Sequence, residues 1–259
     1  MASLLYIPPP RNSYTSVTFM LLRLENSYQS MTSHVRQVER IANNLANAST
    51  VGFRKDRSFV EVLAEGLDKE ESPYSTRQLG HWVDQQQGSL EQTGGSLDVA
   101  LNGEGFFVLS DPDTGATRYT RAGHFLTDEE GTLRAPNGLV VEGQAGPITI
   151  PEDAVTVEIR RNGDVIVDDS LVGTLRVVRF DAPEQLTRID AASFLANGVE
   201  PQDIDEPAVI QGQLENSNVD AVREMSELIA YSRLFEAQQK TLTTVDGYLE
   251  RATRELSRF

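Results

Sequence analysis

The residue types that could perform chemistry are few in this chain and lie far apart. The 259 residues include three histidines, His34, His81 and His124, and no cysteine. None of the histidines has a metal-ligand spacing such as HExxH, and no thiolate is available as a ligand or nucleophile. We interpret each histidine as an ordinary surface or core residue and expect no metal site and no cofactor.

Two short motifs have part of a binding pattern but not all of it. "GEGFF" at 103–107 lacks the last glycine and the following helix of a phosphate-binding loop, so it predicts a turn that enters a strand. "DPDTG" at 111–115 begins like a calcium loop but has no third acid and no bidentate glutamate, which favours a tight turn. No nucleophile elbow or paired-carboxylate motif is legible. We therefore expect no catalytic residue and no small-molecule substrate.

The most unusual spacing is that of three asparagines in "RIANNLANASTVGFRKD", residues 40–56. Asn43, Asn44 and Asn47 each cost helix propensity, and a solvated helix face is normally filled with lysine, glutamate, arginine and glutamine instead. Amides offer donors and acceptors without charge, so they suit a face that packs against another subunit. We interpret the cluster as an intersubunit face, with a solvated face as the alternative.

A long helix is expected to position these asparagines. Apolar residues recur at steps of four and three and form a heptad seam: Leu24, Tyr28, Met31, Val35, Val38, Ala42 and Leu45. This pattern predicts a helix of about 40 Å over residues 20–53. At about 100° per residue the asparagines fall opposite the seam, so we expect them to face away from the intrachain core. Gly52 would end the helix, and Phe53 would be a hydrophobic clamp or part of a local core.

A second helix is predicted from Asn218 to about residue 257, where no proline occurs. Its apolar positions recur every seven residues and are Leu228, Phe235, Leu242 and Leu249. The interleaved positions are mostly polar, so this narrow seam needs a partner helix. Asn218 or Ser217 is expected as the N-cap, and Asp220 and Glu224 lie where the helix dipole favours acids.

Between the helices the pattern is typical of β structure. "VTVEIRRNGDVIVDD" alternates apolar residues on both sides of Asn162-Gly163, which predicts a hairpin. About eight strands are expected between 97 and 180. The predicted fold class is α+β, with two long terminal helices forming a coiled-coil stalk and a central antiparallel β-rich domain, a sandwich or irregular barrel. The predicted segments are an extension 1–19, a helix 20–53, a connector 54–96, a β domain 97–180, a return connector 181–217 and a helix 218–259.

Charge and hydropathy limit the partners. With 39 acidic and 23 basic residues the net charge is -16, which disfavours nucleic acid and anionic membrane surfaces. No run approaches the ~18 apolar residues of a membrane span. The start "MASLLYIPPPRNS" has no basic region and three prolines, so we expect no cleaved signal peptide. The lack of cysteine suits a chain that is exported unfolded into an oxidising space.

Both ends and the middle of the chain resemble one family. "ANNLANASTVGFRKD" and "GQLENSNVDAVREMSELIAYSRLFEAQQK" resemble the two terminal signatures of the bacterial flagellar axial proteins, the rod and hook family. "GSLEQTGGSLDVALNGEGFFVL", "YTRAGHFLTDEEGTLRAPNGLVVEG" and "GPITIPE" look like the β domain of that family. The resemblance covers about residues 20–256. In that family the heptad starts close to the first methionine, so we expect translation to begin at Met20 or residues 1–19 to be an extension.

The resemblance implies a non-enzymatic subunit of the flagellar basal-body rod. Such subunits leave the cell through the flagellar type III export apparatus and assemble with other axial proteins into the drive shaft between motor and hook. The narrow seams further predict that the terminal helices of a free monomer are largely unfolded and fold on docking.

The subtype and the interface follow from the same resemblance. A short β domain, "GPITIPE" directly before the hairpin, and "RLFEAQQK" favour the proximal rod, with the distal rod as the alternative; hook chains carry extra sequence. A secreted carbohydrate-acting or adhesive β protein is the rival from another class. The residues expected at the assembly interface are Asn43, Asn44, Leu45, Asn47, Thr50, Gly52, Phe53, Leu214, Glu215, Ser217, Asn218, Val219, Leu228, Phe235, Leu242 and Leu249.

Overall fold

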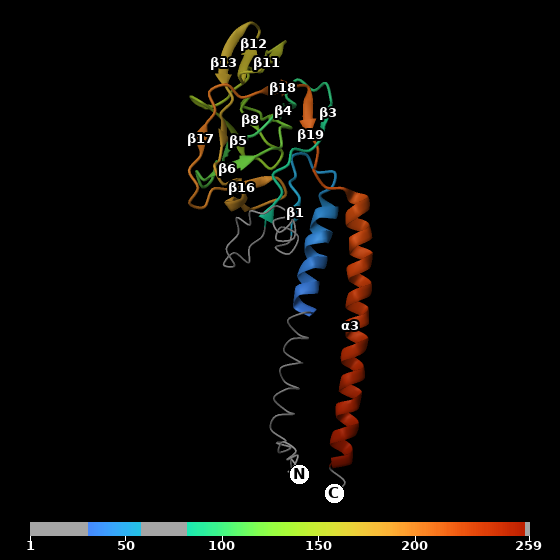
Figure 1. Ribbon diagram of the computed structural model, residues 1–259. Coiled ribbons are helices and arrows are strands. Elements are labelled where there is room, and N and C mark those ends of the chain that lie inside the picture. The colour runs from blue at the N-terminus through green and yellow to red at the C-terminus, as the bar shows by residue number, and fades with distance from the viewer. Residues whose placement is uncertain (1–30, 58–81, 257–259) are drawn as a thin grey trace, which may run out of the picture. The chain divides into compact units, whose positions relative to one another are not determined.

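The computed structural model describes residues 31–57 and 82–256 (Figure 1). They fall into two compact units, each described by itself. The helical unit holds the described parts of Met1–Ile41 and Met225–Phe259, and the β unit spans Ala42–Glu224. The expected extension 1–19, the start at Met20 and much of the first connector lie outside the described residues.

Two α-helices occur in the described residues. The N-terminal helix covers residues 31–46, and α3 covers Ala221–Leu256. α3 has no proline and a single glycine, Gly247, so little in its sequence interrupts it. Within the helical unit the imidazole of His34 lies against the ring of Tyr231, with 6.1 Å between ring centroids.

The predicted fold class of two long terminal helices forming a coiled-coil stalk is wrong. The described N-terminal helix ends at residue 46 and is less than half as long as the 36 residues of α3. The rest of the described chain is β-rich, and its strands are distributed over several sheets. In the described residues, a β-rich chain with a shorter N-terminal helix and a longer C-terminal helix therefore replaces the predicted stalk.

The buried stripe of the N-terminal helix differs from the predicted heptad seam. Ile41 and Asn44 are fully buried and Arg40 nearly so, whereas the seam residues Val35 and Ala42 are exposed. A coiled coil requires apolar residues at its buried a and d positions. Because this helix buries a cation and an amide beside Ile41, polar contacts help to decide which of its residues are covered.

One face of α3 is covered and the other is open. Leu228 and Phe235, seven residues apart, are half-buried in the helical unit. On another side of the helix Met225 and Ile229, about one turn apart, are 45% and 55% exposed, and Leu234, about 180° around the helix axis from Met225, is 43% exposed. The side chains of Leu242 and Leu249 lie outside the described side chains.

Asp220 is the N-cap of α3. Its carboxylate accepts hydrogen bonds from the backbone N–H groups of Val222 and Arg223, at 3.0 and 3.1 Å. A side chain in this position satisfies donors that have no partner inside the helix. The prediction of Asn218 or Ser217 as the N-cap is therefore wrong, and the side chain of Asn218 bonds to other segments of the β unit instead.

The largest sheet of the β unit has ten strands, all paired antiparallel. The main path runs β15-β16-β6-β5-β9-β8-β7, β14 pairs with β5 and β17, and β10 pairs with β9. The strands are β5 Phe106–Ser110, β6 Thr117–Thr120, β7 Leu126–Thr127, β8 Leu133–Arg134, β9 Val140–Gly143, β10 Gly146–Pro147, β14 Val177–Arg179, β15 Thr187–Arg188, β16 Ser193–Leu195 and β17 Gln202–Asp203.

The predicted hairpin is confirmed and extended by a third strand. β11 (Val157–Ile159) pairs antiparallel with β12 (Asp164–Val167), and Gly163 in the turn has a φ of 89°. β13 (Ser170–Thr174) follows a turn in which Asp168 and Asp169 are both left-handed. Asparagine-glycine and paired aspartates are residue types that tolerate such turns.

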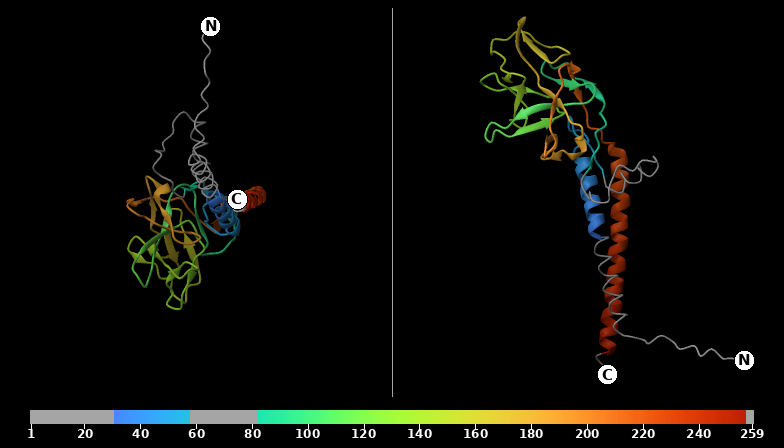
Figure 2. Two further views of the ribbon diagram at one scale, coloured as in Figure 1. Left: turned by 90° about the horizontal axis from the view of Figure 1, so that it is seen from below. Right: turned by 60° about the vertical axis from the view of Figure 1, so that its left-hand side comes forward.

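Three two-stranded sheets join segments that are far apart in the sequence. β1 (Asp56–Arg57) pairs with β2 (Trp82–Val83), β3 (Leu90–Gln92) with β19 (Gln213–Glu215), and β4 (Val99–Leu101) with β18 (Val209–Gln211). A short 3-10 helix, η1, covers Pro183–Gln185. The stretches predicted as connectors, 54–96 and 181–217, thus contain β1–β3 and β15–β19, and Figure 2 shows the β unit from two further sides.

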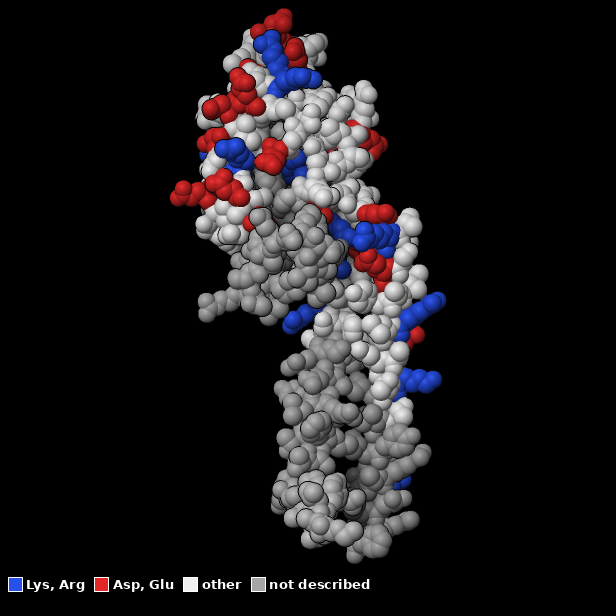
Figure 3. All heavy atoms as spheres, in the orientation of Figure 1, with Lys and Arg blue, Asp and Glu red and all other residues white. Residues whose placement is uncertain are grey.

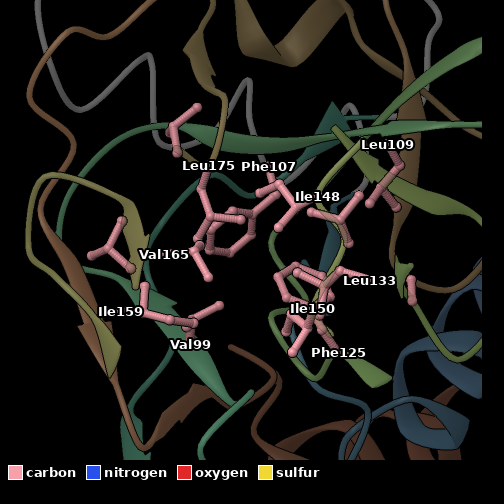
Figure 4. Packing of buried hydrophobic residues seen from close by; sticks show 14 of the residues in the cluster. Val99, Phe107, Leu109, Phe125, Leu133, Ile148, Ile150, Ile159, Val165 and Leu175 are labelled. Carbon is pink, nitrogen blue, oxygen red and sulfur yellow. The ribbon is translucent and has the colours of Figure 1, made fainter. Parts of the chain in front are cut away.

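The core of the β unit lies on both faces of β5. Neighbouring residues of a strand point to opposite faces. Phe107 packs edge to face on Phe125, with 5.3 Å between centroids, in the cluster of Figure 4. Phe106 belongs to a second cluster, where it lies 5.8 Å from Phe194. Because β5 is covered on both faces, "FFVL" is continuously apolar rather than alternating.

Charged groups stay at the surface over most of the β unit. Figure 3 shows acidic side chains spread over its visible face among fewer basic ones. No described helix combines the length and the apolar character that a membrane crossing requires. The charged residues that are buried are concentrated at one site, described next.

Candidate functional site

The two terminal signatures meet inside the β unit. Residues 44–56 and 214–224 come together there with residues of the central sheet and enclose ionised side chains. We call this site the junction. Its members are Asn44, Gly52, Phe53, Arg54, Lys55, Asp56, Arg121, Arg188, Glu215, Asn218 and Glu224.

Glu215 is the centre of one half of the junction. One carboxylate oxygen lies 2.8 Å from the Arg54 guanidinium and the other 3.0 Å from Nε of Arg121, and all three side chains are almost fully buried. Arg121 also donates to the carbonyl oxygens of Gly103 and Gly105, each at 2.6 Å. A buried carboxylate is tolerated only with partners of this kind. Glu215 therefore pairs with one cation of the N-terminal signature, Arg54, and with one that follows β6, Arg121.

Glu224 is the centre of the other half. This residue, in the first turn of α3, is fully buried and pairs with Nζ of Lys55 at 2.7 Å. Its other carboxylate oxygen accepts from Nδ2 of Asn44 at 3.3 Å. The same amide donates to the backbone carbonyl of Asp56 at 3.0 Å, while its oxygen accepts from the Asp56 N–H at 2.9 Å. Asn44 thus connects a helix, a strand and the start of α3.

These contacts correct the prediction for the asparagine cluster. Asn44 is 0% exposed, so the prediction that all three amides face away from the intrachain core is wrong for this residue. Asn43 is exposed, and Asn47 is half-buried, with a local bond from its side chain to the carbonyl of Asn43 at 2.9 Å. Asn44, the middle asparagine, therefore makes contacts within the chain. Its amide suits this position because the backbone of Asp56 offers one donor and one acceptor, and an amide side chain can pair with both.

Gly52 permits the closest backbone approach at the junction. It has a φ of 69°, and its N–H donates to the carbonyl of Glu215 at 2.7 Å. A Cβ on Gly52 would lie 2.3 Å from the backbone nitrogen of Ala122. Only glycine satisfies both the left-handed backbone and this contact.

Asn218 connects the second signature to two other segments. Its Oδ1 accepts from the Lys55 N–H at 2.6 Å, and its Nδ2 donates to the carbonyls of Asp84 and Gln86 at 3.1 and 2.9 Å. The Arg54 guanidinium also donates to the Gln86 carbonyl. The side-chain amide of Asn218 therefore joins the second signature to residue 55 of the first signature and to residues 84 and 86.

Phe53 is part of a local core and is not a clamp at the surface. It is 1% exposed, and the guanidinium of Arg188 lies over its ring at 4.3 Å and over the ring of Phe194 at 5.2 Å. Arg188 also pairs with Asp56 at 3.2 Å and donates to the Arg54 carbonyl. Aromatic faces and a carboxylate together stabilise this partly buried cation.

Burial governs the ionisation of the junction arginines. It lowers the pKa of the Arg121 guanidinium to about 10, although the nearby Glu215 carboxylate opposes the shift. Burial also lowers the pKa of Arg54 and of Arg188 below the usual value, and Glu215 and Asp56 respectively oppose it. These arginines remain charged at neutral pH, and desolvation makes each depend on its carboxylate partner.

The other sequence motifs have structural positions. Asp111 caps its own turn, accepting from the N–H groups of Asp113 and Thr114, so the tight turn is confirmed. "GEGFF" is a turn that enters β5, also as predicted, and its carbonyls bind Arg121. His124 Nδ1 lies 2.6 Å from Asp98. Burial would raise the pKa of Asp98, but hydrogen bonds from Thr93 and His124 outweigh it and lower the pKa.

The predicted site residues have two kinds of position. Asn44, Gly52, Phe53, Leu214 and Glu215 are buried in the β unit. A second group keeps some or much of its surface exposed: Asn43, Leu45, Asn47, Thr50, Ser217, Asn218, Val219, Leu228 and Phe235.

Sequence reasoning missed six members of the junction. Arg54, Lys55 and Asp56 follow Phe53 directly in "GFRKD", so three consecutive charges after a glycine-aromatic pair were the available signal. Arg121, Arg188 and Glu224 are isolated in the sequence. No local pattern marks them, because their partners are distant in the chain.

Known flagellar families match the segments that form the junction. The model described as "Flagella basal body rod protein" matches residues 31–54. The model described as "Flagellar hook protein FlgE/F/G D1 domain" matches 100–167, and that described as "Flagellar basal body rod FlgEFG protein C-terminal" matches 210–255.

Whole-length relatives agree with these matches. The flagellar basal-body rod protein FlgG of Bacillus subtilis is 31% identical, covering 89% of this chain and 97% of its own. FlgG of Caulobacter vibrioides is 32% identical, covering 90% and 98%. The flagellar basal-body rod protein FlgF of Escherichia coli is 34% identical, covering 83% and 90%.

The chain belongs to the flagellar basal-body rod protein family. Its role is that of a structural component of the flagellar rod, and its place is the flagellar basal body. The rival interpretation as a carbohydrate-acting or adhesive protein is set aside.

Replacing Gly52 by alanine is expected to destabilise the β unit far more than replacing Gly94. Both residues are left-handed, with φ of 69° and 73°, so alanine costs each about 1–2 kcal/mol. A Cβ on Gly94 meets nothing within 4 Å, whereas one on Gly52 meets the backbone of Ala122. Urea unfolding of the two variants measures the difference, and equal midpoints would refute the packing argument.

Replacing Glu215 by glutamine is expected to reduce the free energy of unfolding by about 3–5 kcal/mol, because Arg54 and Arg121 would be buried without a counterion. The matched control is Asp203→Asn, which removes the carboxylate of an exposed pair with Arg176. That change should cost no more than about 1 kcal/mol. If chemical denaturation gave equal losses of unfolding free energy for the two variants, the buried pairs would contribute no more to stability than the exposed pair.

Proposed function

We propose that this chain is a proximal rod subunit of the FlgF type, a part of the drive shaft that transmits torque from the motor to the hook. The short β domain and "GPITIPE" directly before the hairpin support this subtype. The distal rod, of the FlgG type, is the second candidate, since FlgG relatives match over 97% and 98% of their length.

The junction is the observation that carries the proposal. A shaft that transmits torque needs its subunits to resist shear between their own segments. Here the end of the N-terminal helix and the start of α3 are tied to the sheet by Glu215 and Glu224 through buried ion pairs. Removing one partner of such a pair costs several kcal/mol, so these segments separate from the sheet only at a high energetic cost.

The exposed face of α3 is the proposed surface for neighbouring subunits. Met225 and Ile229, four residues apart, lie on one open side of the helix and expose apolar surface in the isolated chain. Burial of such surface contributes about 25 cal/mol for each Å² removed from water, which would favour docking of another axial subunit. The exposed and half-buried members of the predicted interface in the β unit, such as Asn43 and Asn47, are proposed to make separate contacts with neighbouring subunits.

Export and assembly follow from the same arrangement. We propose that the chain crosses the flagellar type III export apparatus unfolded and without a cleaved signal peptide. The open face of α3 would then be completed by neighbours that are already in place. Coupling of helix ordering to docking would restrict assembly to the growing tip.

The double variant Met225→Gln with Ile229→Gln is expected to abolish swimming without destabilising the chain. Glutamine keeps helix propensity, and exposed substitutions change stability by no more than about 0.5 kcal/mol. The matched control, Glu236→Gln with Thr241→Gln, changes exposed polar residues of the same helix and should swim normally. Soft-agar swimming and thermal unfolding are the measurements; a motile Met225/Ile229 variant would contradict the proposed surface.

Complementation is expected to separate the two subtypes. The gene should restore swimming to a strain that lacks its proximal rod protein and leave a strain that lacks its distal rod protein non-motile. The reverse result would assign the chain to the distal rod, and the structural role in the rod would stand in either case.

A further inference from the structure

The chain contains four asparagine-glycine pairs, all with an exposed asparagine. Such pairs are prone to lose ammonia, because glycine has no side chain to keep its backbone nitrogen from the preceding side-chain amide. The sequence alone ranks the four pairs equally. They are Asn102-Gly103, Asn137-Gly138, Asn162-Gly163 and Asn197-Gly198.

In three pairs the attacking nitrogen is engaged. The N–H of Gly138 and that of Gly163 each donate to a backbone carbonyl at 2.9 Å and close a turn. The N–H of Gly103 donates to Oε1 of Gln87 at 3.1 Å. A nitrogen in such a bond must break it before it can lose its proton and approach the side chain.

In two of these pairs the asparagine side chain is also directed elsewhere. Oδ1 of Asn137 accepts from the N–H of Leu139 at 3.4 Å, and Oδ1 of Asn162 accepts from the N–H of Asp164 at 3.3 Å. These bonds hold the side-chain carbonyl toward the second following residue. The amide carbon is therefore kept from the nitrogen of the next glycine.

The fourth pair has neither restraint. Gly198 is exposed with a φ of 80°, and its N–H donates to no group in the described part of the chain. A Cβ on Gly198 would meet nothing within 4 Å, so the site is open. The side chain of Asn197 makes a single bond, from Nδ2 to the hydroxyl of Thr187 at 3.0 Å. That bond leaves the amide carbon accessible.

We propose that Asn197 is the site at which the folded chain deamidates without an enzyme. The nitrogen of Gly198 loses its proton to solvent and attacks the side-chain carbon of Asn197. The bond to Nδ2 breaks, Nδ2 takes up a proton and leaves as ammonia, and a succinimide ring closes. Water then opens the ring at either carbonyl and gives an aspartyl or an isoaspartyl residue.

The change affects a defined point of the main sheet. Residue 197 lies two residues after the end of β16, and β16 lies between β15 and β6. The product adds a negative charge, and its isoaspartyl form adds a backbone methylene where the chain leaves the sheet. The bond to Thr187 of β15 would then be remade with a carboxylate as acceptor instead of an amide as donor.

Incubation of the full chain in mildly alkaline buffer tests the proposal. Peptide mapping should show Asn197 converting roughly threefold to tenfold faster than the other three asparagines, the factor that one hydrogen bond contributes. Isoaspartyl methyltransferase labelling should locate the product in the same peptide. In concentrated urea the four rates should become similar, because the differences come from the fold.

Two variants make the result specific. Asn197→Gln should remove about half to three quarters of the ammonia that the four pairs of the folded chain release, and the matched Asn162→Gln should remove no more than about a sixth, as the threefold to tenfold rate difference requires. Faster conversion at residue 102, 137 or 162 of the folded chain would overturn the proposal. Equal rates at all four sites before and after unfolding would overturn it as well.

Discussion

The buried carboxylate of Glu215 is the constraint on which the rest of this structure depends. It is almost fully buried, so it must be paired, and its two partners come from different parts of the chain. Arg54 brings the N-terminal signature, and Arg121 brings the turn that precedes β5. Satisfying one charge therefore fixes three segments, and Gly52 is a glycine because the resulting backbone approach leaves no room for a side chain.

The asparagine at the second centre shows why an uncharged amide is used beside ions. Asn44 faces both backbone groups of Asp56 and the carboxylate of Glu224, so it must donate and accept at once. An aspartate would place a second negative charge against Glu224, and an aliphatic residue would make none of these three hydrogen bonds. The helix accepts its lower propensity because the amide satisfies buried groups that nothing else at this position could satisfy.

The β unit combines apolar cores with a charged junction, and both suit a structural role. β5 is buried on both faces and carries the two cores, and the charged junction lies beside it instead of inside either apolar cluster. Ion pairs resist sliding because they have a defined geometry, whereas apolar contacts tolerate small shifts. A rod protein with both kinds of contact has an apolar core in its β unit, and its two terminal signatures are held to that unit in one defined position by ion pairs.

The sequence by itself determined the family, the absence of a legible catalytic motif, the hairpin around Asn162-Gly163 and the two turns at 103–107 and 111–115. These features depend on residue types and short spacings, which a linear chain displays. Only the tertiary structure decided which face of the N-terminal helix is buried, that Asp220 caps α3, and that Asn44 points inward. Those outcomes depend on partners such as Arg121, Arg188 and Glu224, which are distant in the chain and become neighbours only when the sheet forms. Helical periodicity could locate the asparagines relative to an apolar seam, but it could not foresee that buried polar contacts would help to decide which residues are covered.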